Sequence, residues 1–379
     1  MPIAPQLVMP DLFPDPLAPL RRRIDAVDDE LLRLLNDRAR LVAEVGEVKR
    51  RTRGEGPFYV ASRERAIVER LAAGNEGPFP TEALRPVFQE IFSACLALEK
   101  ALRIAYLGPE ATWTHAAVSH QFGLSAQALP MGTIEAVFAE VERGGADFGV
   151  VPVENSTEGM VGSTLDVFLD SALKISAEIV LPVDHALLLH PGADPGQVQR
   201  VYSHPQALAQ CRRWLAAELP HAACVETGST AEAARMARED VHGAALASEL
   251  AAKLYGLTVA RRRVQDQARN FTRFLVLGAR QAEPTGRDRC SLLLILQDGP
   301  GALLRLLQPL AARGLNLSRI ESHPTRRRPW EYAFFLDLDG HPADPPVAAA
   351  LEELQGLSAS FRLLGAYPKA EPASPGRAA

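Results

Sequence analysis

Apolar residues recur every three or four positions along the first fifty residues of the chain. From Leu20 to about Lys49 they form one stripe that no proline and one glycine interrupt, at Leu20, Ile24, Val27, Leu31, Leu34, Leu41, Val45 and Val48. This spacing predicts a single helix, roughly 45 Å long at 1.5 Å per residue. Short neighbouring helices cannot cover such a stripe, so we expect a partner helix from a second copy of the chain.

Two shorter helices are predicted after a loop rich in glycine at 54–57. Ser62 can cap a helix that runs to about residue 73, and Thr81 can cap another that runs to about residue 102. We therefore expect an all-α domain over 20–102, preceded by a flexible leader at 1–19.

From residue 103 the pattern changes to short apolar strands that alternate with helical segments. The strands are RIAYLGPE, DFGVVPV, LKISAEIVLPV, QRVYSHP, GAALAS and TRFLVLG, with helices at 133–143, 205–218 and 230–239 between several of them. Alternation of this kind predicts an α/β domain over 103–280 with parallel strands, whose ligands bind beyond the strand ends.

A polar linker at 281–289 separates this domain from a smaller one at 287–368. The smaller segment reads as strand, helix, strand, strand, helix, strand, which is the pattern of a ferredoxin-like α+β module. Residues 369–379 are predicted to be a flexible tail.

Composition is consistent with several domains and limits the chemistry. The chain has 379 residues, of which 47% are hydrophobic, and its formal charge of -5 indicates neither nucleic acid nor an anionic membrane as the main partner. There is no signal helix and no run of 18 apolar residues, and the four cysteines show no metal-ligand spacing, so we expect a reduced, cytoplasmic, metal-free protein. Neither glycine-rich nucleotide motif occurs, so no cofactor is expected.

Cations gather on one face of the long helix. Arg38 and Lys49 are eleven residues apart, which places them within about 20° of each other and roughly 16 Å apart. Further candidates are Arg21, Arg63, Glu64 and the pair Cys95 and Glu99 at helical spacing. Such a set predicts an anionic ligand inside a helical bundle, although both cations could also extend from a dimer seam into water.

This segment resembles the helical (class II) chorismate mutase domain. The resemblance lies in Leu-Arg-x-x-Ile-Asp-x-x-Asp from Leu20, then Arg38, Val45-Gly46-x-x-Lys49 and Arg63-Glu64-Arg65. It implies that Arg38, Arg63 and the partner subunit's Arg21 hold the two carboxylates of chorismate. Lys49 would donate to the ether oxygen of the breaking bond, and Glu64 would hold the ring hydroxyl.

The implied rearrangement is unimolecular and needs no acid, base or nucleophile, because clamping the folded substrate and stabilising the ether oxygen suffice. Three positions depart from the family pattern. Glu99 stands where glutamine is common and must be protonated to donate, which predicts mutase activity that favours lower pH. Cys95 replaces a serine, and Val60 falls where an aspartate is common.

Four motifs of the α/β segment lie at strand ends: Gly108-Pro109-Glu110, Glu154-Asn155-Ser156, Ser203-His204 and Thr272-Arg273-Phe274. Together they resemble prephenate dehydratase, which implies two lobes like those of a periplasmic binding protein, with crossings near residues 180 and 265. Thr272 would hydrogen-bond the leaving hydroxyl of prephenate, because threonine is too weak an acid for full proton transfer. Arg273 would hold a carboxylate or order the end of its strand.

The same resemblance implies a set of contacts that orient prephenate: Thr112, Glu154, Asn155, Ser156, Ser203, His204, Gln210 and Phe274. Within it His204 is better explained as a structural histidine than as a base, and Cys211 as a small buried hydrophobe. Ala111 stands where the family usually has glycine, and Trp113 where it has phenylalanine.

The C-terminal module resembles the ACT domain attached to this dehydratase. Its two ligand motifs are DGPGALL, with Gly301, Ala302, Leu303 and Leu304, and RIESHP, with Glu321, Ser322, His323 and Pro324. Such a domain binds phenylalanine at a subunit interface. His323 stands where arginine is usual, so a dimerisation module without a ligand is the alternative.

The resemblances together imply an enzyme that converts chorismate to prephenate and prephenate to phenylpyruvate, with phenylalanine as inhibitor and a homodimer or larger homo-oligomer as the assembly. Two alternatives remain. An arogenate dehydratase would prefer an amino-acid side chain over the pyruvyl group. A two-lobed binding or sensing protein would keep its affinity after Thr272→Ala, whereas an enzyme would lose turnover.

Overall fold

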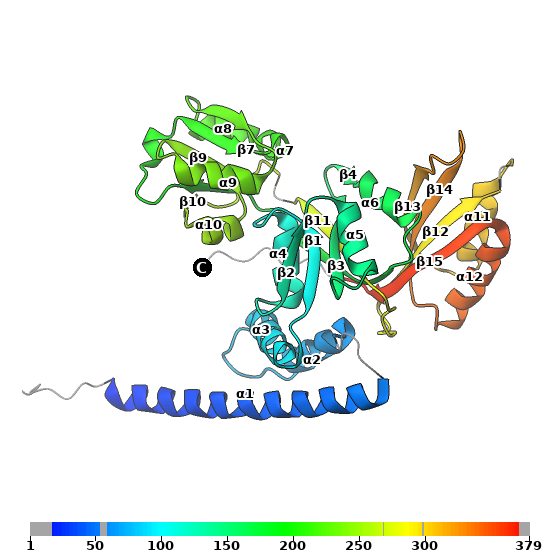
Figure 1. Ribbon diagram of the computed structural model, residues 1–379, viewed down its shortest axis with the longest axis horizontal. Helices are drawn as coiled ribbons and strands as arrows, with labels where there is room; N and C mark the ends of the chain where they lie inside the picture. Colours follow the sequence, from blue (N-terminus) through cyan, green and yellow to red (C-terminus); the bar gives the residue numbers. More distant parts are fainter. Residues whose placement is uncertain (1–16, 54–58, 268, 298, 371–379) are drawn as a thin grey trace, which may run out of the picture. The chain divides into compact units, whose positions relative to one another are not determined.

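The computed structural model describes residues 17–53, 59–267, 269–297 and 299–370, without the side chains at 49, 50, 52 and 53. The chain divides into two compact units, Met1–Phe58 and Tyr59–Ala379. The described part of the first unit is one helix, α1 (Ala18–Arg53), as Figure 1 shows. It begins inside the predicted leader and continues past residue 49. Pairs such as Arg33–Glu30 (2.6 Å) support its polar face.

The predicted apolar stripe of α1 is uncovered in the single chain. Its side chains, from Leu34 at 49% to Leu41 at 61%, are all about half exposed or more. The second copy that should cover them stays a prediction.

The second unit starts with α2 (Ala61–Ala73) and α3 (Thr81–Glu99), so the all-α character of this region is confirmed. The predicted caps were wrong. Val60 and Pro80 occupy the extended cap positions and accept no hydrogen bond through their side chains, whereas Ser62 and Thr81 already lie within the helices. The hydroxyl of Thr81 instead accepts from Asn75 Nδ2 at 2.9 Å.

The first lobe of the α/β region is a sheet in the order β2-β1-β3-β11-β5, with β4 beside β3. Its elements are β1 (Arg103–Leu107), α4 (Trp113–Phe122), β2 (Gln127–Met131), α5 (Ile134–Glu142), β3 (Phe148–Asn155), β4 (Gly159–Met160), α6 (Gly162–Phe168), β5 (Lys174–Pro182) and β11 (Phe271–Gly278). Apolar side chains are buried on both faces of this sheet, as its near-continuous hydrophobic strands predict.

The second lobe is a sheet in the order β10-β6-β9-β7-β8. Its elements are β6 (Ala186–Leu189), η1 (Pro195–Gln197), β7 (Arg200–Ser203), α7 (Pro205–Gln210), α8 (Arg212–Glu218), β8 (Ala223–Glu226), α9 (Thr230–Glu239), β9 (Gly243–Ala247), α10 (Glu249–Tyr255) and β10 (Thr258–Arg261). The described residues that connect the lobes are 183–185 in one crossing and 262–267, 269 and 270 in the other, near the two predicted crossings.

Two expectations for this region need correction. The sheets are mixed: β1 pairs in parallel with β2 and β3, but β11 is antiparallel to β3 and β5. A strand that enters from the other lobe needs no crossover helix, so it can run in either direction. The helix predicted at 205–218 is divided at Cys211 into α7 and α8.

The last domain has the predicted order of six elements and is confirmed as an α+β module. They are β12 (Asp288–Leu296), α11 (Ala302–Ala312), β13 (Leu317–Pro324), β14 (Tyr332–Asp339), α12 (Pro345–Leu357) and β15 (Ser358–Pro368), with the sheet order β13-β14-β12-β15. The two helices cover one face of the sheet over a leucine-rich core.

The other face of this module joins the core of the first lobe. Phe335 and Tyr367 pack in one cluster with Phe168 and Ile175 of that lobe. A side chain at Gly365 would lie 2.2 Å from the backbone oxygen of Ile175, so only glycine permits this approach of β15 to β5.

The start of the predicted tail is held in place. Ala370 N–H donates to Glu178 at 2.8 Å, and the oxygen of Lys369 accepts from Arg65 at 2.5 Å. The predicted leader and tail otherwise lie at 1–16 and 371–379, outside the described residues. No helix in the described ranges is long and apolar enough to span a membrane.

Candidate active sites and effector site

The residues predicted to bind chorismate are divided between the two units. Arg21 and Arg38 lie on α1, and so does Lys49, whose side chain is outside the described residues. The remainder lie on α2 and α3 of the second unit: Arg63, Glu64, Cys95 and Glu99. Arg63 is exposed, Glu64 and Glu99 are half-buried and Cys95 is buried. The convergence of both sets on one ligand stays a prediction.

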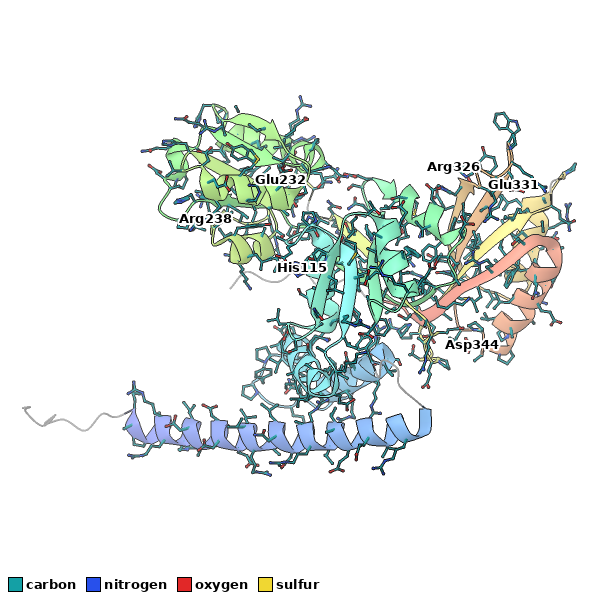
Figure 2. The ribbon with its side chains drawn as sticks, in the orientation of Figure 1. His115, Glu232, Arg238, Arg326, Glu331 and Asp344 are labelled. Atoms are coloured by element: carbon teal, nitrogen blue, oxygen red, sulfur yellow. The ribbon has the colours of Figure 1, made fainter. Side chains whose placement is uncertain are left out.

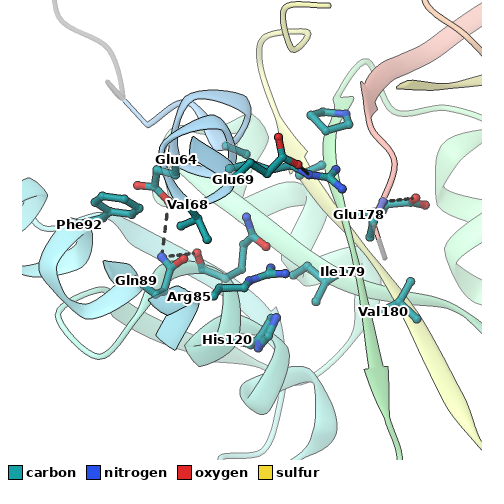
Figure 3. A pocket seen from close by; sticks show the side chains of 16 residues that line it. Glu64, Val68, Glu69, Arg85, Gln89, Phe92, His120, Glu178, Ile179 and Val180 are labelled. Carbon is teal, nitrogen blue, oxygen red and sulfur yellow. Dashed lines mark hydrogen bonds and ion pairs between the residues drawn. The ribbon is translucent and has the colours of Figure 1, made fainter. Parts of the chain in front are cut away.

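Glu64 lines a cavity of about 200 Å³ that α2, α3 and the first lobe enclose (Figure 3). Gln89 Nε2 lies 3.5 Å from Glu64 Oε2 and donates to the backbone oxygen of Gln121 at 2.8 Å. Burial, with a smaller contribution from Arg85, lowers the pKa of His120 to about 4. His120 is therefore neutral near pH 7. Gln89, Arg85 and His120 were not among the residues predicted from the sequence.

Thr272 lies beside Asn155, as the register of β11 with β3 requires. Asn155 Nδ2 donates to Thr272 Oγ1 at 2.9 Å and to Asn270 Oδ1 at 2.9 Å. Because the hydroxyl oxygen accepts from Asn155, the proton of Thr272 remains available to a substrate. The structure thus brings together two predicted residues, Thr272 and Asn155, at the end of the strand pair.

Gln210 connects this group to the second lobe. Its Oε1 accepts from Asn270 Nδ2 at 3.0 Å, and its Nε2 donates to Glu158 Oε1 at 3.1 Å. A cavity of about 420 Å³ opens here, lined by Gln210, Asn270, Glu158, Arg212 and Arg213 among others. Amides, the two carboxylates of Glu158 and Asp266 and two guanidinium groups at its wall suit a polar small molecule.

Several predicted substrate contacts have hydrogen-bond partners in the backbone. Thr112 accepts from the backbone N–H of His115 at the start of α4, and His204 accepts from that of Gln206 at the start of α7. Ser156 Oγ accepts from the N–H of Phe271. The fully buried Ser203 donates to a backbone oxygen of β9. Their described contacts are therefore with backbone.

Phe274 and Cys211 are core residues. Phe274 is 1% exposed in the cluster beneath the first sheet, so it does not reach the cleft. Cys211 is fully buried, and burial raises the pKa of its thiol to about 12. It behaves as the small hydrophobe that the sequence analysis expected.

Ala111 adopts the left-handed conformation, with φ 67°. Glycine reaches that region without strain, which explains the residue usual in the family. The backbone N–H of Ala111 donates to His115 Nδ1 at 3.1 Å, and its oxygen accepts from Ser248 Oγ at 3.3 Å. His115 is labelled in Figure 2. These bonds hold the alanine in place between the two lobes.

Arg273 extends away from Thr272 and into the C-terminal domain. It is 8% exposed, with Nε 2.6 Å from Glu178 Oε2 and Nη1 2.6 Å from Asp337 Oδ2. Its Nη2 donates to the hydroxyl of Tyr367 at 2.9 Å. Glu154, opposite Arg273 in the register, lies on this face too, 3.8 Å from the guanidinium. Both residues therefore join domains and do not face Asn155.

The Arg273 cluster also contains Arg289 and Arg319. Arg289 lies 2.5 Å from Glu178, and Arg319 lies 3.5 Å from Asp337. Burial raises the pKa of Asp337, but Arg273 and Arg319 outweigh it and hold this pKa below its usual value. With Glu154 the cluster has three cations and three carboxylates, which satisfies the charges that it buries.

The two predicted phenylalanine motifs lie on α11 and β13. Gly301 has φ 71° and precedes Ala302, the first residue of α11; Leu303 and Leu304 are exposed by 39% and 63%. Glu321, Ser322, His323 and Pro324 form the end of β13, an edge strand. His323 Nε2 lies 2.7 Å from Asp166 Oδ1 on α6, a contact between the effector motif and the first lobe that was not predicted.

Sequence alternation could have indicated Asn270. It stands two positions before Thr272, where an extended segment directs side chains to the same face. Asp166 and Asp337 gave no such signal, because each is distant in the sequence from the residue that it contacts.

Comparisons with known proteins match three segments of the chain. Family models match in order: chorismate mutase type II at 20–100, prephenate dehydratase at 104–282 and the ACT domain at 291–356. The bifunctional chorismate mutase/prephenate dehydratase of Aquifex aeolicus is 47% identical over 93% of this chain and 98% of its own.

Two solved structures match the dehydratase and ACT regions. One is a prephenate dehydratase from Arthrobacter aurescens in complex with L-Phe, 36% identical, with a TM-score of 0.66 over 71% of this chain and 90% of that one. The other is described as a quorum quenching acylase, 34% identical, with a TM-score of 0.66 over 71% of this chain and 98% of that one.

The full-length relative and the ordered domain matches lead to one conclusion. The chain belongs to the family of bifunctional chorismate mutase/prephenate dehydratases, and it carries an isomerase and a lyase activity on one polypeptide.

Proposed function

We propose that the two reactions take place at separate sites, one in each of two domains at 20–102 and 103–280, with an effector domain at 287–368. Chorismate binds among Arg21 of a partner subunit, Arg38 and Arg63. Lys49 and Glu99 donate to the ether oxygen, and Glu64 holds the ring hydroxyl. The support is the chemistry of this set, since two carboxylates and a developing negative charge need several cations and donors.

Dehydration takes place at Thr272. Prephenate loses carbon dioxide and its ring hydroxyl, and the aromatic product provides much of the driving force. The Thr272 hydroxyl donates a hydrogen bond to the leaving hydroxyl, while Asn155 fixes the Thr272 oxygen from behind. The bond from Asn155 Nδ2 to Thr272 Oγ1 at 2.9 Å is the observation that carries this proposal.

Residues that line the cavity of about 420 Å³ orient prephenate. Gln210 and, at the outer wall, Arg212 and Arg213 supply donors for its carboxylates, whereas both donors of Asn155 are used by Thr272 and Asn270. Closure of the lobes over the substrate would exclude water and strengthen these contacts. Ser156, Ser203 and His204 act by holding the strand and helix ends that present these groups.

Phenylalanine binds at α11 and β13 and inhibits the dehydratase. The Arthrobacter aurescens structure, solved in complex with L-Phe, supports an amino-acid ligand for this type of protein. In the present chain His323 replaces an arginine and contacts Asp166 of α6. An effector that changes this contact changes the position of the first lobe.

The assembly is a homodimer or a larger homo-oligomer in the cytoplasm. Its support is the uncovered apolar stripe of α1 and the open edge of β13, both of which a second copy would cover. A sedimentation measurement across protein concentration tests this, and a monomer at micromolar concentration would contradict it.

One assay tests the function as a whole. Chorismate is supplied to the purified protein, and prephenate and phenylpyruvate are followed with and without phenylalanine. We expect phenylpyruvate to form and to decrease on addition of phenylalanine. Accumulation of prephenate alone would contradict the role of Thr272, and turnover of arogenate faster than prephenate would change the substrate.

A further inference from the structure

Asn270 stands where the two crossings between the lobes meet. It is the residue directly before β11 and is 4% exposed. Its backbone oxygen accepts from the N–H of Val183 in the other crossing at 2.8 Å. The side chain of Asn270 has no role in the function proposed so far.

The amide of Asn270 has one orientation that satisfies its neighbours. Asn155 Oδ1 accepts from the N–H of Thr157 at 3.0 Å and from its hydroxyl at 2.5 Å, so Asn155 Nδ2 must face the other way. Asn270 Oδ1 accepts from this Nδ2, which leaves Asn270 Nδ2 to donate to Gln210 Oε1 at 3.0 Å. The orientation thus follows from acceptors and donors that the backbone fixes.

The second lobe continues this chain of bonds. Gln210 Oε1 also lies 3.0 Å from His185 Nε2, and since the oxygen can only accept, the histidine proton is on Nε2. His185 is 2% exposed, and burial, partly offset by Gln210, lowers its pKa. His185 is therefore neutral near pH 7 and holds Gln210 toward Asn270.

We propose that Asn270 is a positioning residue for the dehydration step. By accepting from Asn155 and donating to Gln210, it locks the amide that donates to Thr272 and ties that amide to the second lobe. The proton of Thr272 is thereby directed at the substrate when the lobes close. This inference rests on the proposed role of Thr272, and it adds a residue that acts through Asn155.

Two variants test the proposal, and the mutase reaction of the same chain is the internal control. Asn270→Ala should lower kcat of the dehydratase by about ten- to a hundredfold, change KM for prephenate by less than about threefold and leave the mutase rate unchanged. Asn316→Ala is the matched control, because it removes an exposed asparagine bond to Asp339 in the C-terminal domain. It should leave both activities as in the wild type.

Asn270→Asp tests the role of Asn270 through the pH dependence of dehydratase kcat, which a purely structural role would leave unchanged. A deprotonated aspartate accepts from Asn155 but cannot donate to Gln210, whereas a protonated one can do both. Burial raises the pKa of such a carboxyl. The ratio of variant to wild-type dehydratase kcat should therefore rise by about tenfold as pH falls from 8 to 5, with the mutase ratio constant.

The possible results distinguish a failure of the proposed dehydratase site from a failure of the role of Asn270. A wild type without dehydratase activity contradicts the function of the site itself. An active wild type with Asn270→Ala within twofold of it contradicts the role of Asn270 alone. If the alanine variant does not fold, the aspartate variant decides, and a pH-independent ratio overturns the proposal.

Discussion

Thr272 and Arg273 are neighbours on β11, and their side chains leave the strand on opposite faces. Thr272 Oγ1 lies 2.9 Å from Asn155 Nδ2, whereas Arg273 Nη1 lies 2.6 Å from Asp337 Oδ2 in the C-terminal domain. One strand therefore carries both the reacting-site hydroxyl and a buried contact with the effector domain. We expect a shift of that domain to move Thr272.

Asp337→Asn should weaken both domain docking and inhibition. It leaves Arg273 and Arg319 with fewer carboxylates in a buried cluster, which costs about 3 kcal/mol of unfolding free energy. Thermal unfolding and a phenylalanine titration of the dehydratase measure the two effects. Asp170→Asn is the control, because its pair with Arg327 is exposed and contributes little. Equal stability and equal inhibition by phenylalanine in the two variants would contradict the coupling between the C-terminal domain and Thr272.

Glu99→Gln should remove the acid preference of the mutase. A glutamine donates to the ether oxygen at any pH, whereas Glu99 donates only when it is protonated. The mutase rate of the wild type should rise as pH falls from 8 to 5, and that of the variant should stay level. Glu82→Gln, on the exposed first turn of the same helix, should keep the wild-type profile. A level wild-type profile would exclude a donating role for Glu99.

His120 should make the chain less stable in acid. Its folded pKa is about 4 against 6.5 in the unfolded chain, so only the unfolded state takes up the proton in between. Stability is full above pH 6.5 and is lost as pH falls toward 4, by about 3 kcal/mol in total. Unfolding of His120→Gln, followed from pH 7 to 4, should show a smaller loss than the wild type. Parallel curves would contradict the burial of a neutral histidine.

Much of the fold followed from periodicity and motif order. The long helix, the two crossings and the element order of the C-terminal module can be predicted from local hydrophobic patterns, which determine where helices and strands form. The predictions of strand direction and of the helix caps were wrong. Strand direction was missed because β11 pairs with strands far away in the sequence. The caps at Val60 and Pro80 depend on backbone conformation without any side-chain bond.

The candidate site was predictable where its residues belong to the motifs that carry the resemblance, although Asn155 and Thr272 are 117 residues apart. Asn155, Gln210 and Thr272 came from motifs at strand ends, and the structure joins them through Asn270. Arg273 was expected to hold a carboxylate or to order the end of its strand, and alternation along β11 turns it to the face opposite Thr272. Its partners Asp337 and Tyr367 lie 64 and 94 residues away, beyond the reach of sequence spacing.

The central claim is that the Thr272 hydroxyl drives dehydration, and Thr272→Val tests it most directly. Valine keeps the shape of threonine and removes the donor. We predict a dehydratase kcat lower by at least about a hundredfold, partial recovery in Thr272→Ser and an unchanged mutase rate in both variants. Conversion of prephenate to phenylpyruvate by Thr272→Val at the wild-type rate would contradict the account.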